Sequence, residues 1–165
     1  MFAKSEQADT LVDTNELIKE SIALLHSELE AAKITIQLEL AERLSLISAH
    51  KGQLEQVMLN LITNAADAMR SIDDRIRLLR VKSEAVRSKG VAISVQDNGP
   101  GIDPKNIDRI FDTFFTTKSH GMGLGLAISR STIEAHGGTL SVSPGVSQGV
   151  VFHINLPAHL SRQAG

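Results

Sequence analysis

The stretch Val91-Ala92-Ile93-Ser94-Val95-Gln96-Asp97-Asn98-Gly99-Pro100-Gly101-Ile102 joins a strand pattern to a glycine-rich turn. Its alternation of apolar and polar residues predicts a strand over 91–97. Asp97 keeps the parity of the apolar residues, so it is expected to face the buried side of the sheet. A carboxylate in that position is costly unless a donor meets it, and the exocyclic amine of a purine is such a donor. Gly99 and Gly101 would permit positive φ and a close approach to a flat ligand, although Asp-Asn-Gly is also a common turn signal.

Upstream of this turn, residues 52–70 carry the clearest helical period in the chain. One face is apolar, and on another face polar residues recur in steps of three and four: Gln53, Gln56, Asn60, Asn64 and Asp67. Asn60 and Asn64 therefore stack on one face. An amide carbonyl is a hard oxygen ligand suited to Mg²⁺, and an amide NH₂ can donate to a phosphate oxygen. The alternative is an ordinary solvated helix face.

Downstream, Phe114-Phe115-Thr116-Thr117-Lys118 is followed by Gly121-Met122-Gly123-Leu124-Gly125-Leu126, which runs into a helix predicted at 123–136. Glycines before a helix N-terminus present free N–H groups and a positive dipole end, which suits phosphate. Lys118 would add a mobile charge. The loop follows no strand and lacks the GK[ST] of a P-loop, so neither common nucleotide motif fits, and a flexible surface loop is the alternative.

The predicted elements, in chain order, place strands next to strands. Further helices are predicted from an N-cap at Asp13 or Thr14 through Leu29 and near 104–110, and further strands at 34–40, 44–47, 77–86, 140–142 and 150–156. Strands joined by short turns favour antiparallel pairs with helices over one face. We therefore expect an α+β fold, a two-layer α/β sandwich with a mixed, mostly antiparallel sheet of about five strands and about three helices.

Composition narrows the class of protein. The 165 residues suit one domain, which we place at 12–157 between a residual linker at 1–11 and a C-terminal tail at 158–165. A net charge of −2 argues against nucleic-acid binding, and the lack of cysteine excludes disulfides and thiolate metal sites. No apolar run has membrane-spanning length and no signal peptide is evident, so a cytoplasmic location is expected.

Four motifs in order resemble those of the GHKL (Bergerat-fold) ATPases, specifically the catalytic and ATP-binding domain of bacterial sensor histidine kinases. Residues 56–69 resemble the N box, 97–102 the G1 box, 110–118 the F box and 120–126 the G2 box. The resemblance covers residues 12–157. The stretches FFTTK, HGMGLGLAISR and EAHGG are most similar to the nitrogen- and oxygen-sensing subtype.

This resemblance implies binding of ATP and Mg²⁺ beneath a mobile lid formed by residues 112–122. Asn64 would coordinate the metal, Asn60 would contact phosphate, and Asp97 would accept a hydrogen bond from the adenine amine. Asn60 and Lys118 would be the catalytic residues. The other implied cofactor-binding residues are Asp67, Gly99, Gly101, Ile102, Phe115, Thr116, Thr117, Gly121, Gly123, Leu124, Gly125, Leu126 and Thr139.

Two departures from the family pattern change these expectations. Where many relatives have a basic residue and then an aromatic one, this chain has Asp67 and Ala68, so more of the phosphate contact falls to Lys118. The F box lacks its usual proline, since Phe111-Asp112-Thr113-Phe114-Phe115 stands in its place. This loss is expected to loosen the lid.

The position that resembles the general base of the hydrolysing relatives is Asn60, which cannot accept a proton at neutral pH. This favours phosphoryl transfer to an acceptor over hydrolysis. None of the six histidines lies in the phosphoacceptor motif of the family, so the resemblance implies an acceptor on a separate dimerisation domain and a response regulator downstream. We expect the chain alone to be a monomer and its parent kinase a homodimer, whose membrane anchoring stays open. The alternatives are a stand-alone ATPase or serine kinase, and a nucleotide-sensing module without catalysis.

Overall fold

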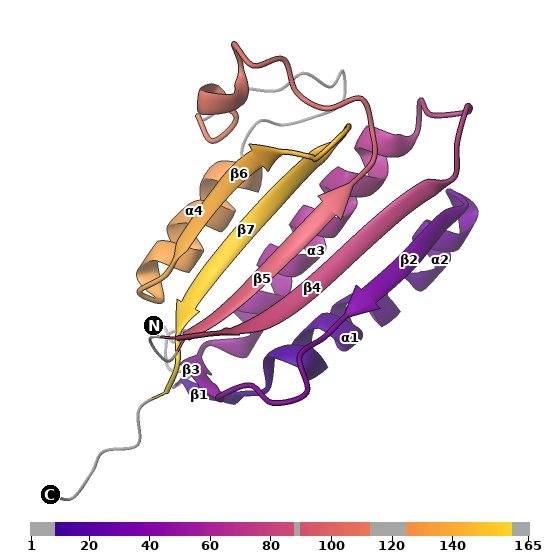
Figure 1. Cartoon of the computed structure of the whole chain (residues 1–165). Coiled ribbons are helices and arrows are strands. Elements are labelled where there is room, and N and C mark those ends of the chain that lie inside the picture. The colour runs from indigo at the N-terminus through magenta and orange to yellow at the C-terminus, as the bar shows by residue number, and fades with distance from the viewer. Residues whose placement is uncertain (1–8, 88–89, 113–124, 160–165) are drawn as a thin grey trace, which may run out of the picture.

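A mixed five-stranded sheet forms one layer of the computed structural model, which describes residues 9–87, 90–112 and 125–159. Its strands lie in the order β2-β4-β5-β7-β6, and every neighbouring pair is antiparallel except β2 and β4 (Figure 1). This confirms the predicted mixed, mostly antiparallel sheet. The strands are β2 (Ile34–Glu39), β4 (Arg77–Val86), β5 (Gly90–Asp97), β6 (Thr139–Pro144) and β7 (Val150–Pro157).

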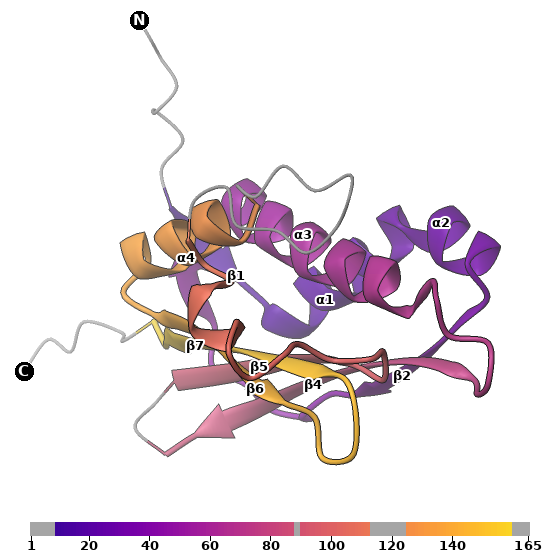
Figure 2. The ribbon, with the colours of Figure 1, turned by 90° about the horizontal axis from the view of Figure 1, so that it is seen from above.

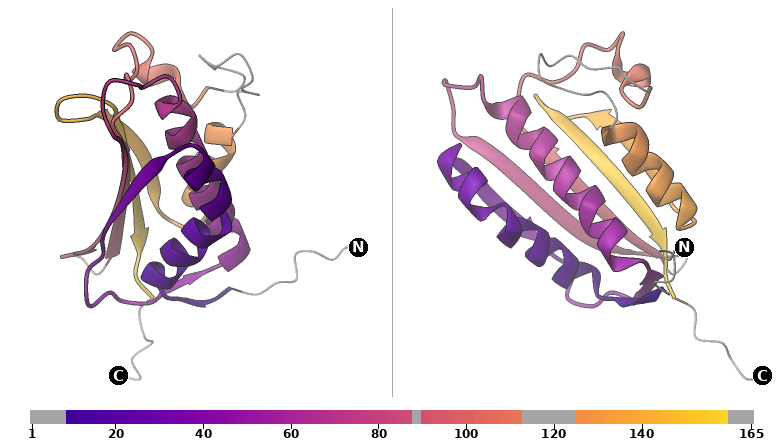
Figure 3. Two further views of the ribbon diagram at one scale, coloured as in Figure 1. Left: turned by 90° about the vertical axis from the view of Figure 1, so that its right-hand side faces the viewer. Right: turned by 180° about the vertical axis from the view of Figure 1, so that it is seen from behind.

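The helices form the second layer and cover one face of this sheet, as Figures 2 and 3 show from two directions. They are α1 (Thr14–Leu24), α2 (His26–Ala31), α3 (Lys51–Met69) and α4 (Gly125–Ala135). The apolar face of α3 supplies much of the core, with Leu61, Ile62 and Met69 fully buried against the strands. Among the helices that the structure describes, none combines the length and apolar character that crossing a bilayer requires.

Asp13 caps the first helix as expected, since its Oδ1 accepts hydrogen bonds from the N–H groups of Asn15 and Glu16. The predicted helix through Leu29 is instead two helices. Leu25 leaves helical geometry (φ −101°, ψ 10°) and its N–H bonds to the carbonyl of Ile22, so α1 ends there and α2 begins. Both segments still bury leucines in the shared core.

Short elements are where the expected pattern and the structure differ. Two three-residue strands, β1 (Thr10–Val12) and β3 (Ile47–Ala49), pair antiparallel as a separate sheet, whereas we expected no element before residue 12 and a strand at 44–47. The helix expected near 104–110 is only a 3₁₀ turn, η2 (Ile107–Arg109). Three residues are too few to show a period, so tertiary contacts decide these elements.

A histidine link holds α3 and α4 side by side. His50, the N-cap of α3, donates its backbone N–H to Nε2 of His136, just beyond α4, over 3.1 Å. The other ring nitrogen of His136 lies 2.8 Å from the carbonyl oxygen of Thr132. Gly137 then ends α4 at φ +81°, and the N–H of Gly138 reaches the carbonyl of Ile133, so the predicted glycine C-cap is confirmed.

Arg77 fixes the other end of α3. Its guanidinium donates to the carbonyl oxygens of Ile72 (3.1 Å), Arg70 (3.0 Å) and Ala32 (2.6 Å). These carbonyls lie at the ends of α3 and α2, where helices leave backbone acceptors unpaired. The C-terminal end of α3 is thereby held at the first residue of β4, next to the end of β5.

Candidate nucleotide-binding site

Asp97 is a buried residue with a carboxylate side chain, and it is the last residue of β5, the central strand of the sheet. Only 3% of its surface is exposed, as the strand parity predicted. Its Oδ1 accepts the N–H of Gly99 over 2.8 Å, and the N–H of Val150 also donates to the carboxylate. Burial raises the pKa of Asp97 above its usual value of 3.8, and these two hydrogen bonds only partly offset that effect. Two lone-pair positions therefore remain for a further donor.

The raised pKa of Asp97 predicts how stability depends on pH. Because the folded state disfavours the ionised form, this group's contribution to stability is fully present below about pH 4 and is lost as the pH rises through the folded pKa. Asparagine cannot ionise, so an Asp97→Asn variant should gain stability relative to the natural chain as the pH rises above about 4. Urea unfolding at several pH values measures this difference. A stability gain of the variant that shrinks towards neutral pH would contradict the raised pKa of Asp97.

The turn after Asp97 needs its two predicted glycines for different reasons. A Cβ at Gly99 would lie 2.8 Å from the carbonyl oxygen of Ala68 on α3, so this glycine permits close helix approach. Gly101 has φ +88°, which side-chain-bearing residues rarely adopt. Ile102 then packs against the core. The last turn of α3 and the turn after β5 are thus in direct contact.

The sequence analysis missed a third contributor, the hairpin between β6 and β7. Gly149 has φ +81°, and a Cβ there would overlap the carbonyl oxygen of Asp97. Val150 follows and donates its N–H to the Asp97 carboxylate. A glycine before a strand was the only local signal, and it does not reveal which distant strand end it meets.

The side chains of Arg75 and Asn98 hold the turn after Asp97 through hydrogen bonds to the backbone. Neither residue was assigned a role from the sequence. The Asn98 side chain accepts the N–H of Leu78 (2.9 Å) and donates to the carbonyl oxygen of Ile76 (2.7 Å). Arg75 donates to the carbonyl oxygen of Asn98 through Nε (3.1 Å) and Nη2 (2.8 Å). The turn between Asp97 and Gly101 is therefore fixed on its backbone, which leaves the Asp97 carboxylate in a defined position.

The three polar residues predicted on α3, Asn60, Asn64 and Asp67, are each half-buried. Asn64 and Asp67 lie in the helical turn that ends at Ala68, whose carbonyl oxygen faces Gly99, and Asp67 also accepts a 3.1 Å hydrogen bond from Nε of Arg70. Asn60 lies further along and donates its Nδ2 to Oγ of Ser129 on α4 over 3.0 Å.

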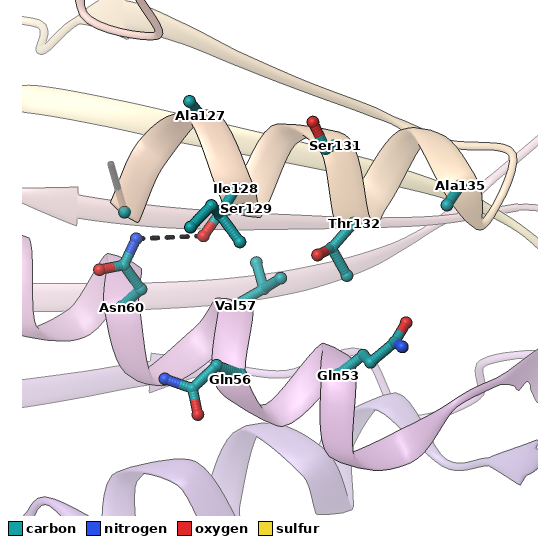
Figure 4. A pocket seen from close by; sticks show the side chains of 11 residues that line it. Gln53, Gln56, Val57, Asn60, Ala127, Ile128, Ser129, Ser131, Thr132 and Ala135 are labelled. Carbon is teal, nitrogen blue, oxygen red and sulfur yellow. Dashed lines mark hydrogen bonds between the residues drawn. The ribbon is translucent and has the colours of Figure 1, made fainter. Parts of the chain in front are cut away.

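An open groove of about 760 Å³ runs between α3 and α4 from Asn60 and Gly125 towards Gln53 and Ala135 (Figure 4). Asp97 and Gly99 are not among its lining residues. Gly125 begins α4, and Leu126 packs against the core. Asn60 and Gly125 therefore lie at one end of this groove (Figure 4).

Thr139 does not join the site. It opens β6 opposite Asn155, which in turn pairs with Ala92 near the start of β5, whereas Asp97 ends that strand. The adjacent Leu140 is buried and Thr139 is exposed, so its side chain faces away from the helices. The predicted residues Phe115, Thr116, Thr117, Lys118, Gly121, Gly123 and Leu124 lie outside the described residues.

Comparison with known proteins decides which family this arrangement represents. The family model described as "Histidine kinase-, DNA gyrase B-, and HSP90-like ATPase" matches residues 49–160, which include α3, the turn after Asp97 and both β6 and β7. The chain belongs to this ATPase family. The family resemblance inferred from the four motifs is thus confirmed.

Relatives within this ATPase family place the chain among sensor kinases. It is 37% identical to the sensor histidine kinase ZraS of Escherichia coli (strain K12) over 92% of this chain and 32% of ZraS. The catalytic domain of histidine kinase ThkA superposes with a TM-score of 0.80 at 32% identity, covering 91% of this chain and 95% of that domain. Full-length ShkA in complex with AMPPNP gives 0.81 at 29% identity, covering 96% of this chain and 33% of ShkA.

The chain spans between about a quarter and a third of the length of the curated relatives it matches. These relatives share the ATPase domain and carry much additional sequence. The nitrogen- and oxygen-sensing subtype stays a prediction.

Proposed function

We propose that this chain binds Mg-ATP and donates the γ-phosphoryl group to a histidine on a separate dimerisation domain, in two-component signalling. The observation that carries the proposal is Asp97, a buried carboxylate with unused acceptor positions, at the contact between α3 and the Gly99 turn. An adenine amine would supply the donor that the carboxylate lacks. The match to the sensor-kinase ATPase domains supports the same ligand.

The residues of α3 suit a magnesium ion that arrives with the triphosphate. The described part of the chain has no group of three acidic or histidine side chains that could chelate a metal alone. Magnesium commonly keeps phosphate oxygens and waters as ligands and takes only one or two from the protein. The carbonyl oxygen of Asn64 fits that limited role, and the bound ion would neutralise charge on the phosphates.

The chemistry around Asn60 favours phosphoryl transfer over hydrolysis. Asn60 is an amide and its Nδ2 is donated to Ser129, so it has no basic atom for a water proton. Asp67 is paired with Arg70, and Asp97 is buried. These residues would bind and orient ATP. An acceptor nucleophile would come from elsewhere.

Five of the six histidines lie in the described residues, and their contacts give no sign of a phosphoacceptor. His50 and His136 link α3 to α4, and Nε2 of His153 lies 2.8 Å from Oγ of Ser143. Nε2 of His26 lies 3.6 Å from Oε1 of Glu30, and the backbone N–H of His159 donates to the carbonyl oxygen of Leu46. The proposed partner is therefore the histidine-bearing helical domain of the same homodimeric kinase, and a response regulator through it. We place this activity in the cytoplasm, whether or not the parent kinase is membrane-anchored.

The chain alone should bind Mg-ATP in a calorimetric titration and yet incorporate almost no γ-phosphate, because the proposed acceptor histidine lies on another domain. Adding the histidine-bearing helical domain should then give acid-labile label on that partner. Acid-labile label on the isolated chain would contradict a separate acceptor. Steady phosphate release without partner would support the stand-alone ATPase, and binding without any transfer would support a nucleotide-sensing module.

A further inference from the structure

The structure holds one polar contact between α3 and α4 that no assigned role explains. Ser129 is 3% exposed, and its Oγ accepts the 3.0 Å hydrogen bond from Nδ2 of Asn60. Figure 4 shows the Asn60 carboxamide with its nitrogen towards Ser129 and its oxygen on the opposite side. The nitrogen end of this side chain is thus anchored on α4, one helix away from its own backbone.

Gly125, one turn before Ser129 on α4, lies against the same carboxamide. A Cβ at Gly125 would lie 2.7 Å from Oδ1 and 2.9 Å from Nδ2 of Asn60. Gly125 is not among the described glycines with positive φ, so an added Cβ would act here by displacing the Asn60 carboxamide rather than by straining the backbone. Residues four apart in a helix share a face, so Gly125 and Ser129 lie on the same face of α4, the one that contacts Asn60.

We propose that Ser129 is a positioning residue that orients Asn60 for the phosphates of ATP, with Gly125 as its steric boundary. This inference rests on the proposed function. Held at Ser129 through its Nδ2, Asn60 keeps its Oδ1 on the side away from Ser129 (Figure 4). Without the hydroxyl, the side chain regains rotamers that nucleotide binding would then have to restrict again.

A buried serine could instead serve only the stability of its helix, and Ser21 provides the matched control. Ser21 is fully buried on α1, and its Oγ donates to the carbonyl oxygen of Leu17 in the same helix over 2.8 Å. Ser21→Ala and Ser129→Ala thus remove equivalent groups from buried helix faces. Only the second removes a bond to Asn60.

The test is calorimetric titration of the full chain with Mg-AMPPNP. We expect Ser129→Ala to weaken binding about 3- to 10-fold, the usual range for one neutral hydrogen bond, and Ser21→Ala to leave affinity unchanged. In an Asn60→Ala background, Ser129→Ala should have no further effect, because it acts through Asn60. Ser129→Cys keeps the volume with a weaker acceptor and should resemble alanine, which guards against a cavity effect.

A second measurement needs no nucleotide. The side-chain amide resonances of Asn60 in a ¹H–¹⁵N NMR spectrum should shift in Ser129→Ala and stay in place in Ser21→Ala. Unshifted resonances, wild-type affinity of Ser129→Ala, or additive losses in the double variant would each overturn the positioning role. Failure of the natural chain to bind Mg-AMPPNP would instead overturn the proposed function, and with it this inference.

Discussion

Asp97→Asn should reduce the affinity for adenine nucleotides at least about 100-fold, since a buried site built to accept a donor would then present its own NH₂ to the adenine amine. The carboxylate is 3% exposed and already takes the N–H groups of Gly99 and Val150, so water cannot readily substitute for it. Asparagine can still accept the Gly99 N–H through its carbonyl oxygen. The variant should therefore fold.

Calorimetric titration with Mg-ATP measures this loss, and Asp103→Asn is the matched control. Asp103 is an exposed carboxylate in the same loop, and its Oδ1 accepts the backbone N–H of Lys105. We expect nucleotide affinity of the control to be that of the natural chain. Unchanged affinity in Asp97→Asn would remove the adenine role assigned to this residue. Equal losses in both variants would point to general loop damage.

Gly149→Ala should be among the most destabilising single changes in this chain. The backbone there has φ +81°, and a Cβ would overlap the carbonyl oxygen of Asp97 and lie 2.9 Å from Cα of Asn98. Backbone atoms in paired strands cannot move aside as a side-chain tip can. We expect a loss of at least about 3 kcal/mol in the free energy of unfolding, and a melting temperature lower by about 6–12 °C.

Gly52→Ala is the opposite control for that prediction. Gly52 lies in the first turn of α3, where the nearest atom to an added Cβ is Cε1 of His50 at 3.7 Å, an ordinary contact. Replacing a helical glycine by alanine should stabilise the chain by about 0.5 kcal/mol. Thermal denaturation of both variants measures whether the melting temperature falls in Gly149→Ala and rises in Gly52→Ala. If Gly149→Ala melts like the natural chain, the close approach of the hairpin to Asp97 is wrong.

Gly149→Ala should also weaken nucleotide binding at temperatures where the variant is folded, because the hairpin supplies the Val150 N–H to Asp97. This coupling shows how the site depends on residues that are distant in sequence. Every predicted site residue precedes residue 140 in the chain, whereas the hairpin reaches Asp97 through residues 149–150. Thr139, which we had assigned to the cofactor from the resemblance, lies at the far end of that hairpin.

The amino-acid sequence alone was enough to predict the features that depend on neighbouring residues. A period of two placed Asp97 on the buried face of β5, a helical period defined α3 and its polar face, and Asp13 and Gly137 marked helix ends. These features depend on backbone geometry repeated over neighbouring residues. The ordered motifs added the family, which the family model confirmed.

Which of these elements contact one another became known from the tertiary structure. The pairing of β1 with β3, the approach of Gly149 to Asp97 and the bond from Asn60 to Ser129 each join segments more than thirty residues apart. No periodicity encodes such contacts, because they follow from how the sheet, its hairpins and the helical layer pack as a whole. The sequence thus predicted which residues bind a nucleotide, and the packing places Gly149 and Val150 at Asp97 and Ser129 at Asn60, while Thr139 lies at the far end of the hairpin.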